Sequence, residues 1–158
     1  GGYLESDFAD ADDLYGRSKF LGEVTDSDSA LTLRTSIIGH EIGRTNSLIN
    51  WFLSQSGKVP GFTEAVFSGL PTIEIAKIVE KVIWENPELS GLYHLSVAPI
   101  SKFDLLTIVN EVYQKSVTLI PDASLVIDRS LNSNRFCEAI DYEPPSWKDL
   151  ITEMHKFG

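Results

Sequence analysis

Residues Leu14–Val24, LYGRSKFLGEV, lie near the start of a chain of 158 residues and carry its most informative spacing. Residues four apart lie on the same face of a helix, so the side chains of Tyr15 and Lys19 are expected to point the same way. A tyrosine hydroxyl ordinarily has a pKa of about 10, and a lysine ammonium held beside it stabilises the phenolate. Such a pair can exchange a proton with a carbonyl oxygen while a hydride moves at the carbon. Taken alone, the spacing also fits a tyrosine packed on a helix beside an exposed lysine.

Strands and helices alternate along the rest of the chain, which indicates an α/β fold. Helices are predicted from Asp12 or Asp13 to about Val24, over Ser47–Gln55, from Pro71-Thr72 to Asn86, from Ser101 onward and from Ser146 to about Lys156. Strands are predicted over Ala30–Ile38, Gly91–Val97 and Val117–Ile120, with a short extended piece over Glu64–Leu70. In the third helix the predicted buried stripe is Ile75, Val79 and Val82, joined by Ala76 and Ile83. The segment Asp122–Pro145 is predicted to be irregular, and a functional loop is one interpretation of it.

The composition excludes several classes of partner. The formal net charge is −10, and a chain this acidic repels phosphate backbones and anionic lipid surfaces as a whole. We therefore expect no nucleic-acid and no membrane partner, although a local basic pocket for one small phosphate ligand is compatible with this charge. Cys137 is the single cysteine, so no disulfide forms within the chain and a cytoplasmic location is expected. No Cys/His cluster has the spacing of a metal site.

Five stretches together resemble one enzyme family, in the same order along the chain. Residues 15–23, YGRSKFLGE, resemble the active-site helix of the extended short-chain dehydrogenases/reductases, where the pattern is YGxSKxxGE. The other four stretches are Leu33–Gly39, Ser68–Thr72, Gly91–Ser96 and Asp128–Ser133, the last with an insertion. Three of them (SGLPT, GLYHLS and DRSLNS) are similar to the dTDP-4-dehydrorhamnose reductase branch of the family.

This resemblance implies an α/β fold that is the C-terminal part of an NAD(P)-binding Rossmann-type extended reductase with a small α/β substrate-binding lobe. Residues 1–44 are expected to form the end of the Rossmann core, and residues 45–158 the substrate-binding lobe. The family's Gly-rich fingerprint, which seats the cofactor pyrophosphate, is nowhere in the sequence. The stretch Gly39–Gly43 does not have the pattern of that motif, and it follows a different element from the one that carries the motif in the family. We therefore expect a piece of a longer protein, which by itself neither holds NAD(P)H tightly nor turns over.

The resemblance also implies an activity, a cofactor and site residues. The expected reaction is hydride transfer from NADPH or NADH to the 4-keto group of a nucleotide-activated sugar. Tyr15 is the implied general acid/base, and Lys19 assists it while binding the nicotinamide ribose. The strand end expected to approach the nicotinamide consists of Thr35, Ser36 and Ile37. The candidate contacts to the diphosphate or sugar are Arg44, Asn46, Arg129, Asn132 and Ser133.

Several of these interpretations have alternatives. Arg44 also fits the role of a surface cation, and Asn46 fits the role of a helix cap. Arg129 and Asn132 also fit the role of residues that organise a loop. His94 is expected to be a hydrogen-bonded structural histidine rather than a catalyst. The alternative functions are a nucleotide-sugar epimerase or dehydratase, and a non-catalytic nucleotide-sugar-binding module. The resemblance implies a homodimer, although apolar surface exposed by truncation is another source of pairing.

Overall fold

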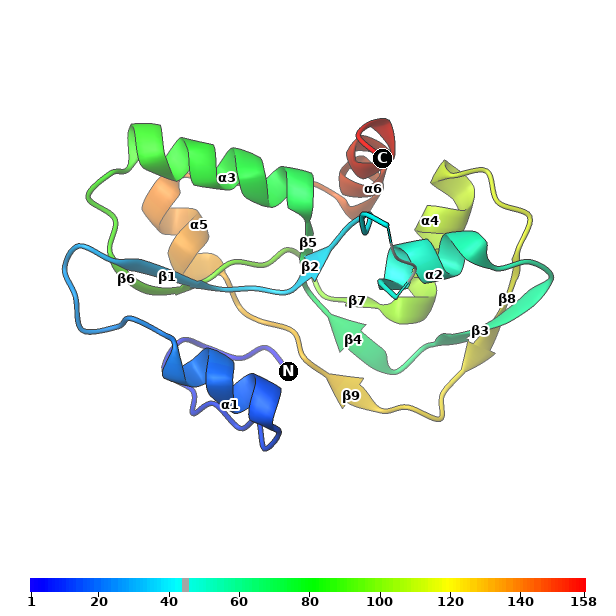
Figure 1. Ribbon diagram of the computed structural model, residues 1–158, viewed down its shortest axis with the longest axis horizontal. Helices are drawn as coiled ribbons and strands as arrows, with labels where there is room; N and C mark the ends of the chain where they lie inside the picture. Colours follow the sequence, from blue (N-terminus) through cyan, green and yellow to red (C-terminus); the bar gives the residue numbers. More distant parts are fainter. Residues whose placement is uncertain (44–45) are drawn as a thin grey trace.

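Helices and strands alternate along the chain in the computed structural model, which describes residues 1–43 and 46–158. Figure 1 shows two lobes side by side, with the C-terminal helix α6 (Trp147–Lys156) between them at the upper edge. Buried apolar side chains from both lobes belong to one continuous core. The α/β class predicted from the sequence is therefore what the chain adopts.

The first lobe is built on a pair of parallel strands, β1 (Leu31–Arg34) and β6 (Gly91–His94). Helices α3 (Thr72–Glu85) and α5 (Asn134–Ile140) lie on one side of this pair, and α1 (Leu14–Leu21) lies on the other (Figure 1). The register places Arg34 opposite His94, so the last residues of both strands meet at the carboxyl end of the pair.

The second lobe contains two small sheets and two helices. One sheet is the parallel pair β3 (Lys58–Phe62) and β8 (Thr118–Asp122). The other sheet has three strands, β4 (Ala65–Phe67), β7 (Ile100–Ser101) and β9 (Ile127–Asp128). Strand β4 lies in the middle, antiparallel to β7 and parallel to β9. The helices are α2 (Leu48–Ser54) and α4 (Lys102–Val112).

A short parallel pair, β2 (Ile37–Ile38) and β5 (Leu70–Pro71), lies where the two lobes meet. The core around it is apolar, and its largest fully buried side chains include Phe52, Phe136, Leu70, Leu95, Leu105 and Ile151. Burying apolar area of this kind is the main favourable term in folding. The core therefore holds both lobes, and with them the junction between β1 and β2, in one arrangement.

Local signals in the sequence predicted most helix starts correctly. Asp13, Ser47, Ser101 and Ser146 each accept a hydrogen bond from a backbone amide in the first turn of the following helix. In α4 and α6, an aspartate three residues after the capping serine also accepts the serine hydroxyl, at 2.7 and 2.6 Å. These contacts satisfy amide groups that the helix itself leaves without a partner.

Three expectations about the secondary structure are corrected. The segment 122–145 is not simply irregular, because it contains β9 and the helix α5. The strand β3 was not anticipated, since Pro60 and Gly61 weaken the strand pattern. The strand expected over Ala30–Ile38 is divided into β1 and β2 at Thr35 and Ser36.

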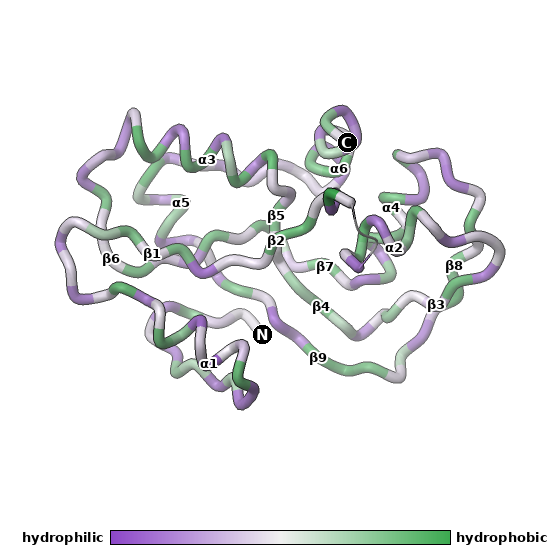
Figure 2. The backbone as a smooth tube through the Cα atoms, in the orientation of Figure 1, coloured by the Kyte–Doolittle hydropathy of each residue, from purple (hydrophilic) through white to green (hydrophobic). Residues whose placement is uncertain are grey.

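The buried face of α3 only partly matches the predicted stripe, of which Ile75 and Val82 pack against the core. Val79 and Ile83 are 40% and 57% exposed, whereas Ile78 and the carboxylate-bearing Glu74 are buried. Glu74 accepts a hydrogen bond from the Tyr142 hydroxyl at 2.9 Å and lies 3.5 Å from the Lys77 ammonium. The helix thus turns a paired carboxylate inward, which an apolar stripe alone does not predict. Figure 2 shows hydrophobic residues recurring along α3 between hydrophilic ones.

Of the described helices, none is long and apolar enough to cross a membrane.

Candidate functional site

The face of α1 that carries Tyr15 and Lys19 is open to solvent. The Asp13 carboxylate accepts the Gly16 amide at 2.8 Å and so begins the helix immediately before Tyr15. The Lys19 Nζ atom lies 5.3 Å from the centroid of the Tyr15 ring. The tyrosine side chain is 73% exposed, so its hydroxyl is accessible to a ligand. The structure thus brings the two residues together on one accessible face, as the spacing predicts.

Helix α1 is attached to the rest of the lobe by its carboxyl end. None of its eight residues is buried. Just beyond the helix, both carboxylate oxygens of Glu23 accept from the Arg34 guanidinium, at 2.6 and 2.8 Å. Next to this pair, the Val24 amide donates to the Thr32 hydroxyl at 3.2 Å, and that hydroxyl donates back to the Val24 carbonyl at 2.8 Å. Polar contacts to β1 therefore set the position of the Tyr15 face.

The Arg34 guanidinium belongs to a larger polar cluster that sequence reasoning missed. Hydrogen bonding to Glu23 raises the pKa of Arg34, and the charge of Glu5 acts in the same direction. His94 is 1% exposed and lies beside Arg34, with its Nε2 atom 3.5 Å from Nη1. Its Nδ1 atom is 3.0 Å from the carbonyl oxygen of Tyr3. His94 is therefore buried and hydrogen-bonded, as expected of a structural histidine.

The strand end expected to approach a nicotinamide runs from Thr35 and Ser36, between β1 and β2, to Ile37, the first residue of β2. Thr35 is half-buried, whereas Ser36 and Ile37 are exposed, with Ile37 at 61%. The Ser36 carbonyl accepts the Leu70 amide at 2.9 Å, which fixes the backbone at this point. The carboxyl ends of parallel strands are the usual ligand-binding edge of an α/β sheet. These three residues thus lie at an edge suited to a ligand.

The candidate substrate contacts fall in two separate loops. Asn46 lies in the loop between β2 and α2, and its backbone amide donates to Glu41 Oε2 at 2.8 Å. Arg44, in the same loop, is outside the described residues. Helix α2 is capped by Ser47, so the cap alternative for Asn46 does not apply.

The second loop runs from β9 to α5. The Arg129 side chain is exposed. Asn132 Oδ1 accepts the Asn134 amide at 2.9 Å, which organises the start of α5. Ser133 is buried, and its hydroxyl donates to the Ser96 carbonyl at 2.9 Å. Among these three side chains, the guanidinium of Arg129 is thus the most open to solvent.

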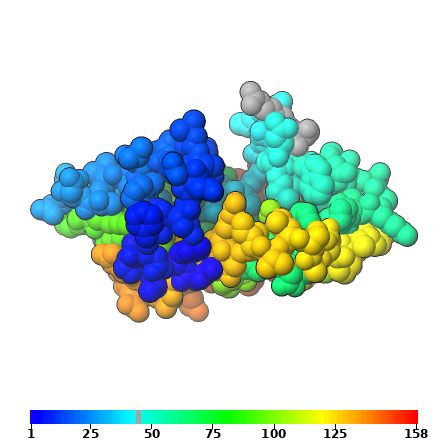
Figure 3. Space-filling model, turned by 90° about the horizontal axis from the view of Figure 1, so that it is seen from below, coloured from blue at the N-terminus to red at the C-terminus, as the bar shows by residue number. Residues whose placement is uncertain are grey.

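The residues before α1 lie against this second loop. Tyr3 forms a parallel bridge with Leu131, and its carbonyl accepts the Asn132 amide at 2.8 Å. Figure 3 shows the dark blue N-terminal residues directly beside the orange segment that follows β9. The structure therefore connects the Tyr15 helix with the Asn132 loop, although more than a hundred residues separate them.

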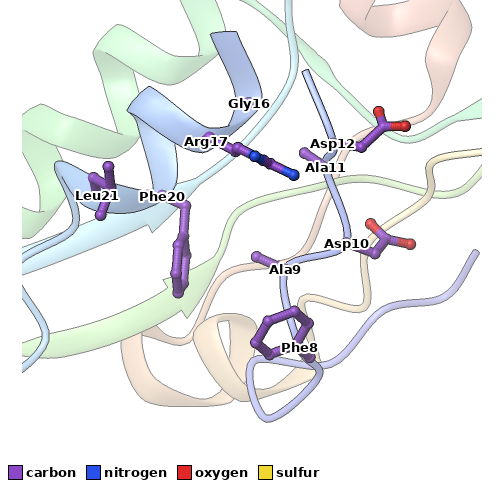
Figure 4. Close-up of a pocket in the computed structure, with 9 residues that line it drawn as sticks. All are labelled: Phe8, Ala9, Asp10, Ala11, Asp12, Gly16, Arg17, Phe20 and Leu21. Atoms are coloured by element: carbon purple, nitrogen blue, oxygen red, sulfur yellow. The ribbon is translucent and has the colours of Figure 1, made fainter. Parts of the chain in front are cut away.

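A cavity of about 420 Å³ lies between α1 and the preceding extended segment. Figure 4 shows Phe20 and Arg17 extending from the helix toward that segment, which carries Phe8 and Asp10. The Phe8 and Phe20 ring centroids are 6.4 Å apart. Tyr15 and Lys19 do not line this cavity. A second hollow of about 290 Å³ lies between the lobes and is lined by Gly39, His40, Thr72, Ile73, Ala76, Met154 and Phe157.

Comparison with known proteins finds similarity in structure. No family model matches the sequence, and no curated protein matches it. The fold is similar to a dTDP-4-dehydrorhamnose reductase from Yersinia enterocolitica, with a TM-score of 0.73 and 20% identity over 90% of this chain and 56% of that one. The same enzyme from Bacillus anthracis, solved in complex with NADP, gives 0.71 and 16% over 90% and 52%. A UDP-N-acetylglucosamine 4-epimerase from Bacillus cereus gives 0.64 and 18% over 90% and 50%.

The chain thus spans about half the length of the solved structures it matches. Its fold is that of about half of a reductase or epimerase of this kind, which confirms both the fold class and the resemblance at the level of the fold. At these identities the similarity carries no residue roles, so the site rests on the geometry described above.

Proposed function

We propose that this chain is the C-terminal portion of an extended short-chain reductase that reduces the 4-keto group of a nucleotide-linked sugar with NADPH or NADH. The observation that carries the proposal is the pairing of Tyr15 and Lys19 on one open face of α1. The similarity of the fold to dTDP-4-dehydrorhamnose reductases supports it. In the division we propose, residues 1–44 complete the Rossmann core and residues 45–158 contribute the substrate lobe, while β6, α3 and α5 of the latter pack back against the core strand β1.

In this proposal the Tyr15 hydroxyl donates the proton that the carbonyl oxygen of the sugar gains. The Lys19 ammonium, on the same face, stabilises the phenolate that is left. When bound, a nicotinamide cofactor supplies the hydride for the carbonyl carbon. Lys19 and the strand end from Thr35 to Ile37, which follows the carboxyl end of β1, would hold its nicotinamide end.

We assign the sugar diphosphate to the two loops at the candidate site. Arg129 presents an exposed guanidinium, which suits a diphosphate, and Asn132 neighbours it in the loop before α5. Asn46 is the described candidate in the loop after β2, and Arg44 is proposed as a second contact on the chemistry of its guanidinium alone. Ser133 donates its hydroxyl proton to Ser96, so it offers a ligand only its remaining lone pairs.

The experiment that tests the proposal follows NADPH absorbance in the longer protein that contains this chain, with a dTDP-4-keto-6-deoxy sugar as substrate. Oxidation of the cofactor that depends on the sugar supports the reductase. Interconversion of the sugar without net oxidation assigns the epimerase alternative, which the Bacillus cereus fold match favours as second candidate. Binding of the nucleotide-sugar with neither reaction assigns the binding module.

The 158-residue chain alone is expected to bind NADPH weakly, because the sequence lacks the Gly-rich loop that seats a pyrophosphate. Isothermal titration of the chain with NADPH measures this directly. A dissociation constant in the micromolar range or below would contradict the proposed division of the site.

A further inference from the structure

We infer that His94 is a positioning residue that couples the Tyr15 helix to the Asn132 loop, and that it does so as the neutral Nδ1–H tautomer. The inference rests on the proposed function, because the proposed function assigns helix α1 to catalysis and the Asn132 loop to substrate binding. It assigns a task to a buried histidine whose ring contacts Arg34 and Tyr3.

The tautomer follows from the chemistry of the two partners of the ring. The Arg34 guanidinium can only donate, so the His94 Nε2 atom, 3.5 Å from Nη1, must carry the lone pair. The Tyr3 carbonyl oxygen can only accept, so Nδ1, 3.0 Å away, must carry the hydrogen. The Nε2–H tautomer and the protonated ring would each set an N–H group against a cation. Since the ring is 1% exposed, solvent does not offer it other partners.

On its Nε2 side, His94 supports the carboxyl end of α1. Arg34 holds Glu23 through two hydrogen bonds and holds the His94 ring through a third nitrogen. The Arg34 side chain is 21% exposed and the Glu23 side chain is 15% exposed, so the ion pair between them is largely shielded from solvent. Helix α1 has no buried residue, and this linkage is therefore one of the few contacts that orient Tyr15.

On its Nδ1 side, His94 supports the loop before α5. The Tyr3 carbonyl that accepts from Nδ1 also accepts the Asn132 amide at 2.8 Å. The Tyr3 amide donates to the Ser130 carbonyl at 3.1 Å. The Glu5 carboxylate accepts the backbone amide of His94 at 2.8 Å and holds the same segment from the other side. Displacing the ring from Tyr3 would therefore release the segment against which the loop is paired.

Two substitutions separate the two sides of the ring. The amide of asparagine reaches the position of Nδ1 but not of Nε2, so H94N keeps a donor for Tyr3 and loses the contact to Arg34. The longer glutamine reaches the position of Nε2, so H94Q keeps an acceptor for Arg34 and loses the contact to Tyr3. His155 is exposed on α6, and the H155N and H155Q variants provide matched controls.

The expected kinetic result in the longer protein is a split between kcat and KM. Loss of a hydrogen bond to a charged group typically costs about tenfold, so H94N should lower kcat roughly tenfold with little change in KM. H94Q should raise KM for the nucleotide-sugar by a similar factor, with kcat nearly retained. The His155 variants should change neither constant. The inference would be overturned if both His94 variants showed the same combination of lowered kcat and raised KM. It would also be overturned if their melting temperatures fell while kcat and KM stayed at the wild-type values.

Two measurements need no activity and keep this inference separate from the proposed function. Nitrogen-15 NMR of the His94 ring at neutral pH should show the Nδ1–H tautomer, and the Nε2–H tautomer would overturn the coupling. Hydrogen exchange at the Asn132 amide should accelerate about tenfold in H94Q and not in H94N. Acceleration in both variants or in neither would also count against it. If both results hold while the wild-type protein neither oxidises NADPH nor converts the sugar, the proposed function fails and the positioning role of His94 stands.

Discussion

At the scale of single residues, Gly69 lets two backbone segments approach each other beside the candidate nicotinamide edge. A β-carbon at Gly69 would lie 2.4 Å from the Ser36 carbonyl oxygen and 2.9 Å from the Ser36 β-carbon. The same carbonyl accepts the Leu70 amide, which closes the junction between β2 and β5. Because the two nearest obstructing atoms, the carbonyl oxygen and carbon of Ser36, belong to the backbone, no rotamer change can make room for a side chain.

We therefore expect Gly69→Ala to lower the free energy of unfolding by about 1–3 kcal/mol, the usual cost of forced packing. Gly22→Ala is the matched control, because its β-carbon would meet carbonyl oxygens at an ordinary 3.5 Å. That control should change stability by no more than about 0.5 kcal/mol. Urea denaturation of both variants measures the difference, and equal stabilities would contradict the close approach.

Tyr113 predicts a pH dependence of stability. Burial raises its pKa to about 12, and its hydroxyl lies 2.8 Å from His40 Nε2. An unfolded tyrosine titrates at about pH 10, so the unfolded chain loses this proton first. The stabilisation is therefore complete below about pH 10 and is lost as the pH rises toward 12. Over this window the unfolding free energy of Tyr113→Phe should decline less steeply than that of the wild type. If the unfolding free energies of the two proteins fell in parallel with pH, Tyr113 would not be the source of this pH dependence.

At the scale of elements, the parts of the fold that the sequence predicts are those with local causes. Serine caps at Ser47, Ser101 and Ser146 are visible in the sequence because donor and acceptor lie within one turn. Helix α5 lacks this signal because its N-cap residue, Ser133, makes no side-chain cap. The stripe predicted for α3 is right for Ile75 and Val82 but wrong for Val79 and Ile83, because apolar residues occur around much of the helix and the buried Glu74 is not apolar.

Helix α1 is expected to open more readily than α4, although both are capped. Helix α4 buries Leu105, Leu106 and Val109, whereas α1 buries none of its residues. Local opening is governed by such packing, so the amides of α1 should exchange with solvent at least about tenfold faster than those of α4. Mass spectrometry of exchanged peptides gives both rates. Arg34→Met should accelerate α1 further without affecting α4, and similar protection of the two helices would contradict this account.

At the scale of the whole molecule, the candidate site joins segments that are distant in the sequence. The spacing of Tyr15 and Lys19 predicts their shared face, because four residues make about one helical turn. The contact of Arg34 with His94 depends on the register of β1 and β6, which no local pattern specifies. The bridge from Tyr3 to Leu131 likewise follows from the packing of the complete lobe. The sequence therefore predicts the chemistry on the helix but not the polar network that positions it.

We propose that Tyr15 supplies the proton in a hydride-transfer reaction on a nucleotide-linked 4-keto sugar. The most direct test of this proposal is the rate of NADPH oxidation by the longer protein carrying Tyr15→Phe, with Tyr113→Phe as a control that leaves the α1 face unchanged. We predict that Tyr15→Phe lowers kcat by about a hundredfold or more while the nucleotide-sugar still binds, since general acid catalysis contributes roughly that much. A Tyr15→Phe protein that oxidises NADPH at the wild-type rate would contradict the account.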